Sequence, residues 1–142
     1  MICKISDISD QVLYEFLSYC MSPVPKRIKN ECSNYKTKTN RELYGIYLDK
    51  TLRGIIGLIR GELETELKHI AIHPEFRIQG LGSKLIEYVI ESTKINKIIA
   101  ETDKDTVNFY KKKGFKITSL GEKYPGVERF KCEYEQFFVG SS

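Results

Sequence analysis

The fold of this chain is decided by one stretch, Ile70-Ala71-Ile72-His73-Pro74-Glu75-Phe76-Arg77-Ile78-Gln79-Gly80-Leu81-Gly82-Ser83. The residues from Glu66 to Ile72 predict a strand, and Pro74 ends it because proline cannot donate a ladder hydrogen bond. After the glycines, apolar residues recur every three or four positions as far as about Thr93, which predicts an amphipathic helix. We therefore expect a strand, then a glycine-bearing loop that opens directly into a long helix.

A loop of this kind can bind an anion. The first N–H groups of a helix have no acceptor within the helix, and the helix dipole adds partial positive charge at that end. Gly80 and Gly82 lack the Cβ atoms that would hold a phosphate away from the backbone, while Arg77 and Lys84 add full positive charges. The alternative is that the two glycines only shape a tight turn between strand and helix.

The segments on either side of this stretch alternate between helical and strand patterns. A first helix is predicted after Asp10, with Cys20 as a small core residue on its apolar face. This order of elements is typical of an α/β domain with a mixed sheet. The other predicted elements are strands at Met1–Ile5, Leu43–Leu48, Leu52–Arg60, Ile95–Glu101, Phe115–Leu120 and about Arg129–Tyr134, and helices at Val24–Tyr35 and Thr106–Lys113.

Length and composition indicate one globular domain. The chain has 142 residues, 41% hydrophobic and 30% charged, so its core needs no disulfide or metal to hold it together. We expect the domain to span residues 1–135, with a tail at residues 136–142. The net charge of +4 suits an anionic ligand but is too small for a nucleic-acid-binding domain.

The sequence also argues against membrane and metal-binding classes. Charged residues enter every window long enough to cross a bilayer, and the N-terminus lacks the apolar stretch of a signal peptide, so we expect a cytoplasmic protein without membrane association. His69 and His73 fall on or beside a predicted strand, so no metal site is expected. Four cysteines form no CxxC pair and are expected to be free thiols: Cys3, Cys20, Cys32 and Cys132.

Two motifs carry a resemblance to a known family. Arg77-x-x-Gly80-x-Gly82 resembles the acetyl-CoA loop of the GNAT superfamily of N-acetyltransferases, whose pattern is Gln/Arg-x-x-Gly-x-Gly/Ala, and it fits neither the P-loop nor the dinucleotide fingerprint. Downstream, the segment from Asp103 to Phe115 resembles the family's second motif, a short helix with a tyrosine followed by Gly-Phe. The resemblance implies a single-domain GNAT-like fold with a central mixed, mostly antiparallel sheet flanked by helices.

The resemblance also implies which residues bind acetyl-CoA, used as a co-substrate with no metal. In the family, the strand before the loop offers backbone groups to the pantetheine arm, and the loop holds the pyrophosphate with backbone N–H groups. Asp103 departs from the family, because many members carry asparagine there. By position, the implied cofactor-binding residues are Ile70, Ala71, Ile72, Arg77, Ile78, Gln79, Gly80, Leu81, Gly82, Ser83, Asn108 and Tyr110.

Catalysis by such an enzyme needs a base and an acid. A protonated amine cannot attack a thioester until it loses a proton, and Glu66 resembles in position the glutamate that serves as base in the histone-acetylating members. Glu101 at the end of the next strand and a water relay are the alternatives. Tyr110 matches the family's usual general acid, and a tyrosine stays protonated at neutral pH and can donate to the leaving thiolate.

The resemblance implies an N-acetyltransferase that moves an acetyl group from acetyl-CoA to a primary amine by direct attack in a ternary complex. The alternative is a catalytically silent acetyl-CoA-binding sensor or interaction module. The acceptor, a small molecule or a protein amine, is not identified by the sequence. We expect no nucleic-acid or membrane partner and a monomer or homodimer, and the pattern assigns no role to the tail.

Overall fold

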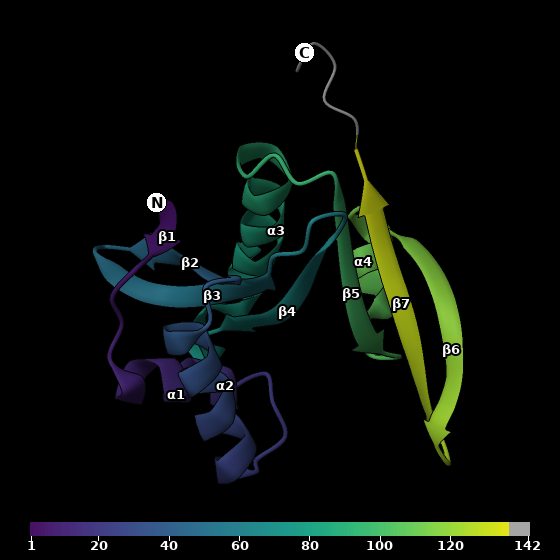
Figure 1. Cartoon of the computed structure of the whole chain (residues 1–142), viewed down its shortest axis with the longest axis horizontal. Helices are drawn as coiled ribbons and strands as arrows, with labels where there is room; N and C mark the ends of the chain where they lie inside the picture. The colour runs from purple at the N-terminus through teal and green to yellow at the C-terminus, as the bar shows by residue number, and fades with distance from the viewer. Residues whose placement is uncertain (137–142) are drawn as a thin grey trace.

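A single mixed sheet of seven strands forms the centre of the molecule (Figure 1). The computed structural model describes residues 1–136. Its strands lie in the order β1-β2-β3-β4-β5-β7-β6. The elements in chain order are β1 (Ile2–Ile5), α1 (Asp10–Ser18), α2 (Pro25–Thr37), β2 (Arg41–Leu48), β3 (Thr51–Ile59), β4 (Thr65–Ile72), the 3-10 helix η1 (Pro74–Gln79), α3 (Leu81–Ser92), β5 (Lys97–Asp103), α4 (Val107–Lys112), β6 (Lys116–Tyr124) and β7 (Val127–Glu135).

The predicted order of elements and the mixed, mostly antiparallel sheet are confirmed, and the differences lie in the connections. The expected loop after His73 is a 3-10 helix, which Pro74 starts with its fixed φ and His73 caps by accepting the Glu75 N–H at Nδ1. β6 and β7 are longer than predicted, because their pairing continues to Tyr124 and Val127 beside the turn. Of the predicted tail, residues 137–142 lie outside the described residues.

Helices cover both faces of the sheet and enclose two apolar cores. Figure 1 places α1 and α2 on one face and α3 on the other. The first core gathers Leu13, Phe16 and Leu17 of α1 against the sheet, and the second gathers Leu85, Ile86 and Val89 of α3. None of the helices in residues 1–136 has the length and hydropathy needed to cross a bilayer.

β4 carries a bulge that decides which of its side chains face which core. Gly57 of β3 lies opposite His69, but the next β3 residue lies opposite Leu67, so Lys68 is left over on the bulged strand. Leu67 consequently packs with α3, whereas Ala71 packs with α1 and α2. His69 comes to lie on the α2 face, where its ring contacts Tyr35.

β4 and β5 pair over a short distance and then separate. The two parallel strands are in register only at Thr65 with Ile98 and at Glu66 with Ile99. Beyond Glu66, β4 is paired on one side alone, with β3. The edge of β4 that faces β5 is therefore without a strand partner from residue 67 to residue 72.

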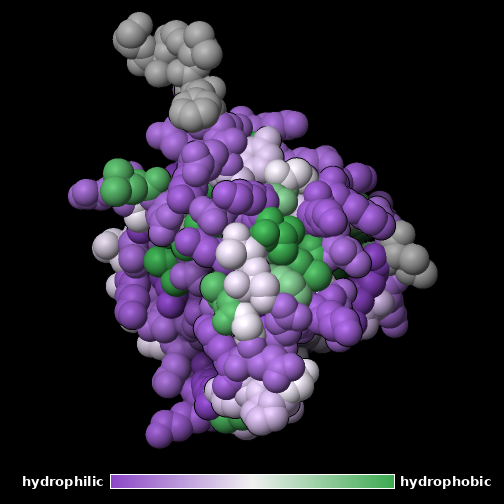
Figure 2. All heavy atoms as spheres, turned by 90° about the vertical axis from the view of Figure 1, so that its right-hand side faces the viewer, coloured by the Kyte–Doolittle hydropathy of each residue, from purple (hydrophilic) through white to green (hydrophobic). Residues whose placement is uncertain are grey.

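β6 closes the sheet as a long and largely exposed edge strand. Figure 2 shows the side of the molecule that lies at the right of Figure 1, where the surface is mostly hydrophilic with a few hydrophobic spots. Exposed Leu120 and Val127 lie on β6 and β7, while Lys116, Glu122 and Lys123 interrupt β6 with charge. Charged side chains on an edge strand oppose pairing with another chain.

Candidate active site

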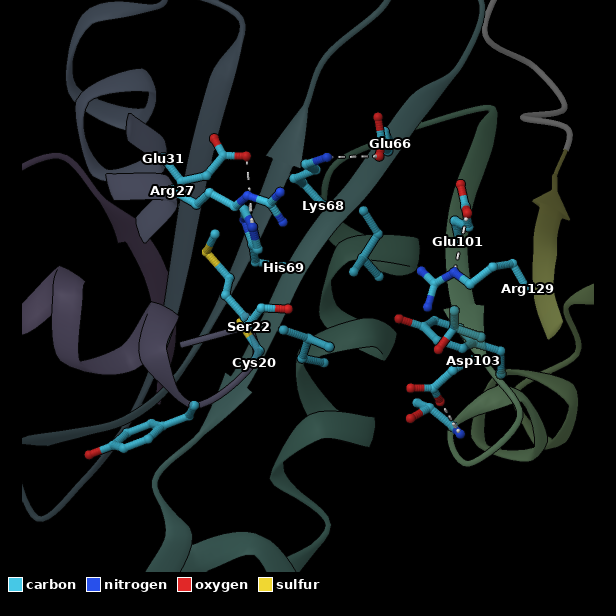
Figure 3. Close-up of a pocket in the computed structure, with 17 residues that line it drawn as sticks. Cys20, Ser22, Arg27, Glu31, Glu66, Lys68, His69, Glu101, Asp103 and Arg129 are labelled. Carbon is cyan, nitrogen blue, oxygen red and sulfur yellow. Dashed lines mark hydrogen bonds and ion pairs between the residues drawn. The ribbon is translucent and has the colours of Figure 1, made fainter. Parts of the chain in front are cut away.

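A cavity of about 880 Å³ lies where β4 and β5 separate. One wall comes from β4, α2 and the connection between α1 and α2, and the other from β5, α4 and β7. Figure 3 shows Glu31, His69 and Cys20 on the first wall and Glu101, Asp103 and Arg129 on the second. Glu66, Ile70 and Tyr110 also line this cavity, so three sequence-predicted site residues meet there.

The unpaired edge of β4 forms part of the first wall. Ile70 and Ile72 are half-buried and Ala71 is buried, and all three pair only with β3. Apart from the Ile72 carbonyl, which accepts a hydrogen bond from Arg77, the backbone groups on the other edge have no strand partner and can bond an extended ligand.

The turn from η1 into α3 presents free backbone donors. The first helical hydrogen bond runs from the Lys84 N–H to the Gly80 carbonyl, at 3.2 Å. Apart from Ile78, whose contacts the structure does not describe, no residue in 1–136 accepts a hydrogen bond from the N–H groups of Leu81, Gly82 and Ser83. Gly80 has a φ of 70°, in the left-handed region that glycine adopts without strain. This turn has the geometry of an anion site at a helix N-terminus.

Gly82 links that turn to the cavity. A Cβ at Gly82 would lie 3.6 Å from Ile70 Cδ1, 3.6 Å from Phe109 Cζ and 3.9 Å from Ile72 Cγ1. These are ordinary contacts, so a methyl group fits there, whereas a larger side chain would extend between β4 and α4. The glycine keeps the approach from the turn to the cavity open.

Three further cofactor candidates, Arg77, Gln79 and Asn108, have exposed side chains. Arg77 is exposed, and its Nε donates to the Ile72 carbonyl at 3.3 Å. Gln79 and Asn108 are exposed, and neither they nor Arg77 line the cavity. Ile78 lies in η1, and its side chain is outside the part of the chain that the structure describes.

Tyr110 is positioned by α4 and by two aromatic neighbours. Its side chain is 4% exposed, with ring centroids 5.5 Å from Phe109 and 5.3 Å from Phe115, both in edge-on packing. Burial raises the pKa of the Tyr110 hydroxyl well above its ordinary value. The phenol is therefore protonated at neutral pH and can act as a donor in the cavity.

The two carboxylate candidates differ in their surroundings. Glu66 is 37% exposed at its side chain, with Lys68 Nζ 3.9 Å from Oε2. Glu101 accepts hydrogen bonds from Lys123 Nζ at 2.9 Å and Arg129 Nε at 3.3 Å. The Lys123 bond and then the Arg129 bond hold the pKa of Glu101 below its ordinary value, although burial opposes them. These ion pairs make the Glu101 carboxylate a poor proton acceptor.

Asp103 fixes the exit from β5. Its Oδ1 accepts the Thr106 N–H at 3.0 Å, which closes the turn ahead of α4. The N-cap residue of α4 is Thr106, so the Asp103 side chain caps the turn ahead of the helix.

The prediction that Cys20 belongs to the core is wrong. α1 ends at Ser18, so Cys20 no longer lies on the apolar face of that helix. It is exposed and its thiol lines the cavity. The surrounding protein desolvates this thiol and raises its pKa to about 11, so it is protonated at neutral pH. Burial also raises the pKa of Cys132 to about 11.

Glu31 and Tyr35 of α2 were not predicted as site residues, and His69 had no predicted role at the site. Glu31 and His69 line the cavity, and the Tyr35 hydroxyl lies 2.6 Å from His69 Nδ1. The one available signal was the polar character of α2 at these positions. The polar character of α2 does not show which residues of β4 contact this helix, because that depends on the bulge at Lys68.

Comparison with known proteins identifies the family. The model of the acetyltransferase (GNAT) domain matches residues 39–117. The chain belongs to the GNAT acetyltransferase family. The matched GNAT segment runs from just before β2 into β6 and includes β4, η1, α3 and α4. A curated relative from Bacillus methanolicus, described as an uncharacterized N-acetyltransferase, is 30% identical over 63 residues, which are 44% of this chain and 52% of the relative. The chain thus spans about half the length of this relative.

Solved structures share the GNAT fold over the whole described chain. The ribosomal-protein-S18-alanine N-acetyltransferase of Escherichia coli superposes with a TM-score of 0.81 at 18% identity, covering 99% of this chain and 96% of that one. A GNAT family acetyltransferase of Elizabethkingia anophelis with acetyl-CoA bound superposes with a TM-score of 0.71 at 21% identity, covering 96% and 97%. At these identities the likeness shows the fold alone.

Proposed function

We propose that this GNAT protein transfers an acetyl group from acetyl-CoA to a primary amine by direct attack in a ternary complex. The observation that carries the proposal is the junction of three features where β4 and β5 separate. These are the unpaired edge of β4, the free N–H groups of the η1–α3 turn, and the hydroxyl of buried Tyr110. Acetyl-CoA uses all three features. Its pantetheine arm is bound by the strand edge, its phosphates are held by the N–H groups, and its sulfur is protonated by the hydroxyl as it leaves.

The residues of the turn and of β4 fit acetyl-CoA as a co-substrate. The N–H groups of Leu81, Gly82 and Ser83 would hold the pyrophosphate, and Arg77 and Lys84 would add positive charge. The backbone at Ile70, Ala71 and Ile72 would bond the pantetheine arm in the manner of an added strand. The neighbour from Elizabethkingia anophelis, which has the same fold, has acetyl-CoA bound.

The chemical step balances without a further reactant. The neutral amine nitrogen forms a bond to the thioester carbonyl carbon, the carbon–sulfur bond breaks, and the sulfur leaves as a thiolate. Glu66, directly or through water, takes the proton of the amine, because its carboxylate is half-exposed and carries no short ion pair. Tyr110 gives its proton to the departing thiolate, since its hydroxyl is protonated and lines the same cavity. Solvent then takes the proton from Glu66 and returns one to Tyr110, which restores both groups.

Acetyl transfer is tested by following thiol release from acetyl-CoA with a panel of primary amines, together with calorimetric titration of acetyl-CoA. We expect binding of acetyl-CoA and release of CoA that depends on the amine. Binding without transfer to any amine would favour the alternative of a silent acetyl-CoA-binding module. Absence of binding would refute both.

We further propose that the protein acts in the cytoplasm, because Cys3, Cys20, Cys32 and Cys132 are free thiols.

A further inference from the structure

A second polar site lies on the α2 wall of the cavity, apart from Tyr110 and Glu66. It consists of Glu31 of α2 and His69 of β4, whose side chains are 14% and 7% exposed. Figure 3 shows the Glu31 carboxylate and the His69 ring pointing toward one another from the helix and the strand. Both groups are buried deeply enough to need partners, and each has one atom without a hydrogen bond.

Glu31 offers one free carboxylate oxygen to the cavity. Its Oε2 accepts hydrogen bonds from Arg41 NH1 at 2.9 Å and from Asn34 Nδ2 at 2.8 Å. Its Oε1 accepts none from residues 1–136, and it is not among the fully buried atoms that lack a partner. Oε1 is therefore open to the cavity, on a carboxylate that two other side chains hold in place.

His69 offers one free ring nitrogen beside that oxygen. Its Nδ1 is bonded to the Tyr35 hydroxyl at 2.6 Å. That hydroxyl lies where a Cβ on Gly57 would collide with it, so the glycine opposite His69 makes room for the contact. His69 Nε2 lies 3.9 Å from Glu31 Oε1, which is too far for a direct hydrogen bond.

The gap between these two atoms fits a single nitrogen with several N–H groups. A nitrogen about 2.9 Å from each atom bridges them at ordinary hydrogen-bond length. Burial lowers the pKa of His69 to about 4 despite the opposing charge of Glu31, so the ring is neutral at pH 7. Its Nδ1–H can donate to the Tyr35 oxygen, which leaves the Nε2 lone pair as an acceptor. Two acceptors and one negative charge match an ammonium group.

The cations nearby do not occupy this position. Arg41 bonds the far oxygen of Glu31, and Lys68 extends toward Glu66, 3.9 Å from its Oε2. Arg27 lines the cavity but is exposed and makes no ion pair with Glu31. A ligand cation can therefore reach Glu31 Oε1 between them.

The ammonium that suits this site is one that stays charged. Burial raises the pKa of Glu31, but the hydrogen bonds from Asn34 and Arg41 outweigh it and hold that pKa below its ordinary value. An ionised carboxylate stabilises the protonated form of an amine, whereas the reacting amine has to lose its proton before it attacks. The reacting nitrogen is thus better placed elsewhere in the cavity.

Building on the N-acetyltransferase activity proposed above, we propose that Glu31 and His69 bind a second ammonium group of the acceptor, which is therefore an alkyl diamine or polyamine. Glu31 and His69 then determine specificity for the acceptor and are not the base. The distance from the Glu31–His69 site to the acetyl group of acetyl-CoA then determines how long an acceptor fits between the two.

The test compares diamines with monoamines of the same length. 1,4-Diaminobutane, 1,6-diaminohexane, butylamine and hexylamine are titrated calorimetrically into the protein saturated with CoA, and their turnover with acetyl-CoA is measured in parallel. We expect one diamine to bind at least about tenfold more tightly than its monoamine, about 1.4 kcal/mol. Glu31→Gln, which keeps the shape of the side chain, should abolish that preference by raising KM with little change in kcat.

The matched control is Glu62→Gln, which removes an exposed carboxylate outside the cavity and should keep the diamine preference. His69→Gln provides a second variant should Glu31→Gln fail to fold. An unchanged preference in the folded variant, or equal weakening of diamines and monoamines, overturns the proposal. Calorimetric preference for a diamine without turnover of any amine would refute the proposed activity while supporting this site, so the two failures are distinguishable.

Discussion

At the scale of single residues, the hydroxyl of Tyr110 is the group whose role is most directly testable. Phenylalanine keeps the ring and its packing against Phe109 and Phe115 but removes the donor. We expect Tyr110→Phe to bind acetyl-CoA nearly as well as the unmodified protein and to transfer acetyl about a hundredfold more slowly. Single-turnover transfer at saturating acetyl-CoA measures this loss.

The control for that substitution is Tyr88→Phe, since Tyr88 lies in α3 against Tyr44 and outside the cavity. Its rate should be unchanged. If Tyr110→Phe also stays within a factor of about two, which is under about half a kcal/mol of barrier, then Tyr110 only packs and another group protonates the sulfur.

Glu66 is the second residue whose role depends on one proton. Glu66→Gln removes the base, so turnover should fall most near neutral pH and recover in part at high pH, where free amine is already present. The profile of kcat/KM against pH measures this. Glu101→Gln should change the profile less, because Lys123 and Arg129 already hold the Glu101 carboxylate ionised. A uniform loss at every pH would assign Glu66 to binding or structure.

At the scale of elements, the junction of η1 and α3 depends on the small size of Gly82. A Cβ there makes only ordinary contacts with Ile70, Ile72 and Phe109, so Gly82→Ala should fold and bind acetyl-CoA with a small loss. Gly82→Trp should fold as well but place an indole between β4 and α4. We expect it to weaken acetyl-CoA at least about a hundredfold in calorimetric titration, about 2.7 kcal/mol. Equal affinity of the two variants would move the cofactor away from this turn.

The contact between α2 and β4 makes stability depend on pH through His69. The folded protein keeps this ring neutral until about pH 4, whereas an unfolded histidine takes up a proton below about 6.5. The unfolded chain then binds more protons between these values, so the free energy of unfolding falls as pH falls, by up to about 3 kcal/mol. Urea unfolding at pH 7, 5 and 4 should show a smaller fall for His69→Gln. Identical falls would mean that His69 titrates normally.

At the scale of the whole molecule, the active-site candidates come together because β4 and β5 pair only at their first residues and then separate. β4 and β5 share only two register positions, and helices on both faces hold the separated halves in place. The cavity therefore receives residues from α2, β4, β5, α4 and β7. A seven-stranded sheet with continuous pairing from β4 to β5 would leave no room for a ligand at this point.

Residue spacing is enough to predict the order of elements, the glycine turn and the short helix that carries Tyr110. Helical and strand periodicities are local, so Leu81, Leu85 and Val89 indicate the α3 face without knowledge of its neighbours. Gly80 and Gly82 likewise predict a turn that leaves backbone donors free, because that property depends on only a few consecutive residues. The short helix with Tyr110 and the following Gly114 belongs to the same class of local signal.

Which polar groups share a cavity, and what charge they carry, depends on how distant segments of the chain pack together. The bulge at Lys68 turns His69 toward α2, and no periodicity in β4 marks that switch. Lys123 and Arg129 hold Glu101 ionised across 22 and 28 residues of sequence, and Arg41 reaches Glu31 from the next element. Cys20 lies outside the core because α1 ends at Ser18, two residues before it. These outcomes depend on strand pairing and on contacts between distant segments, which residue spacing along the chain does not contain.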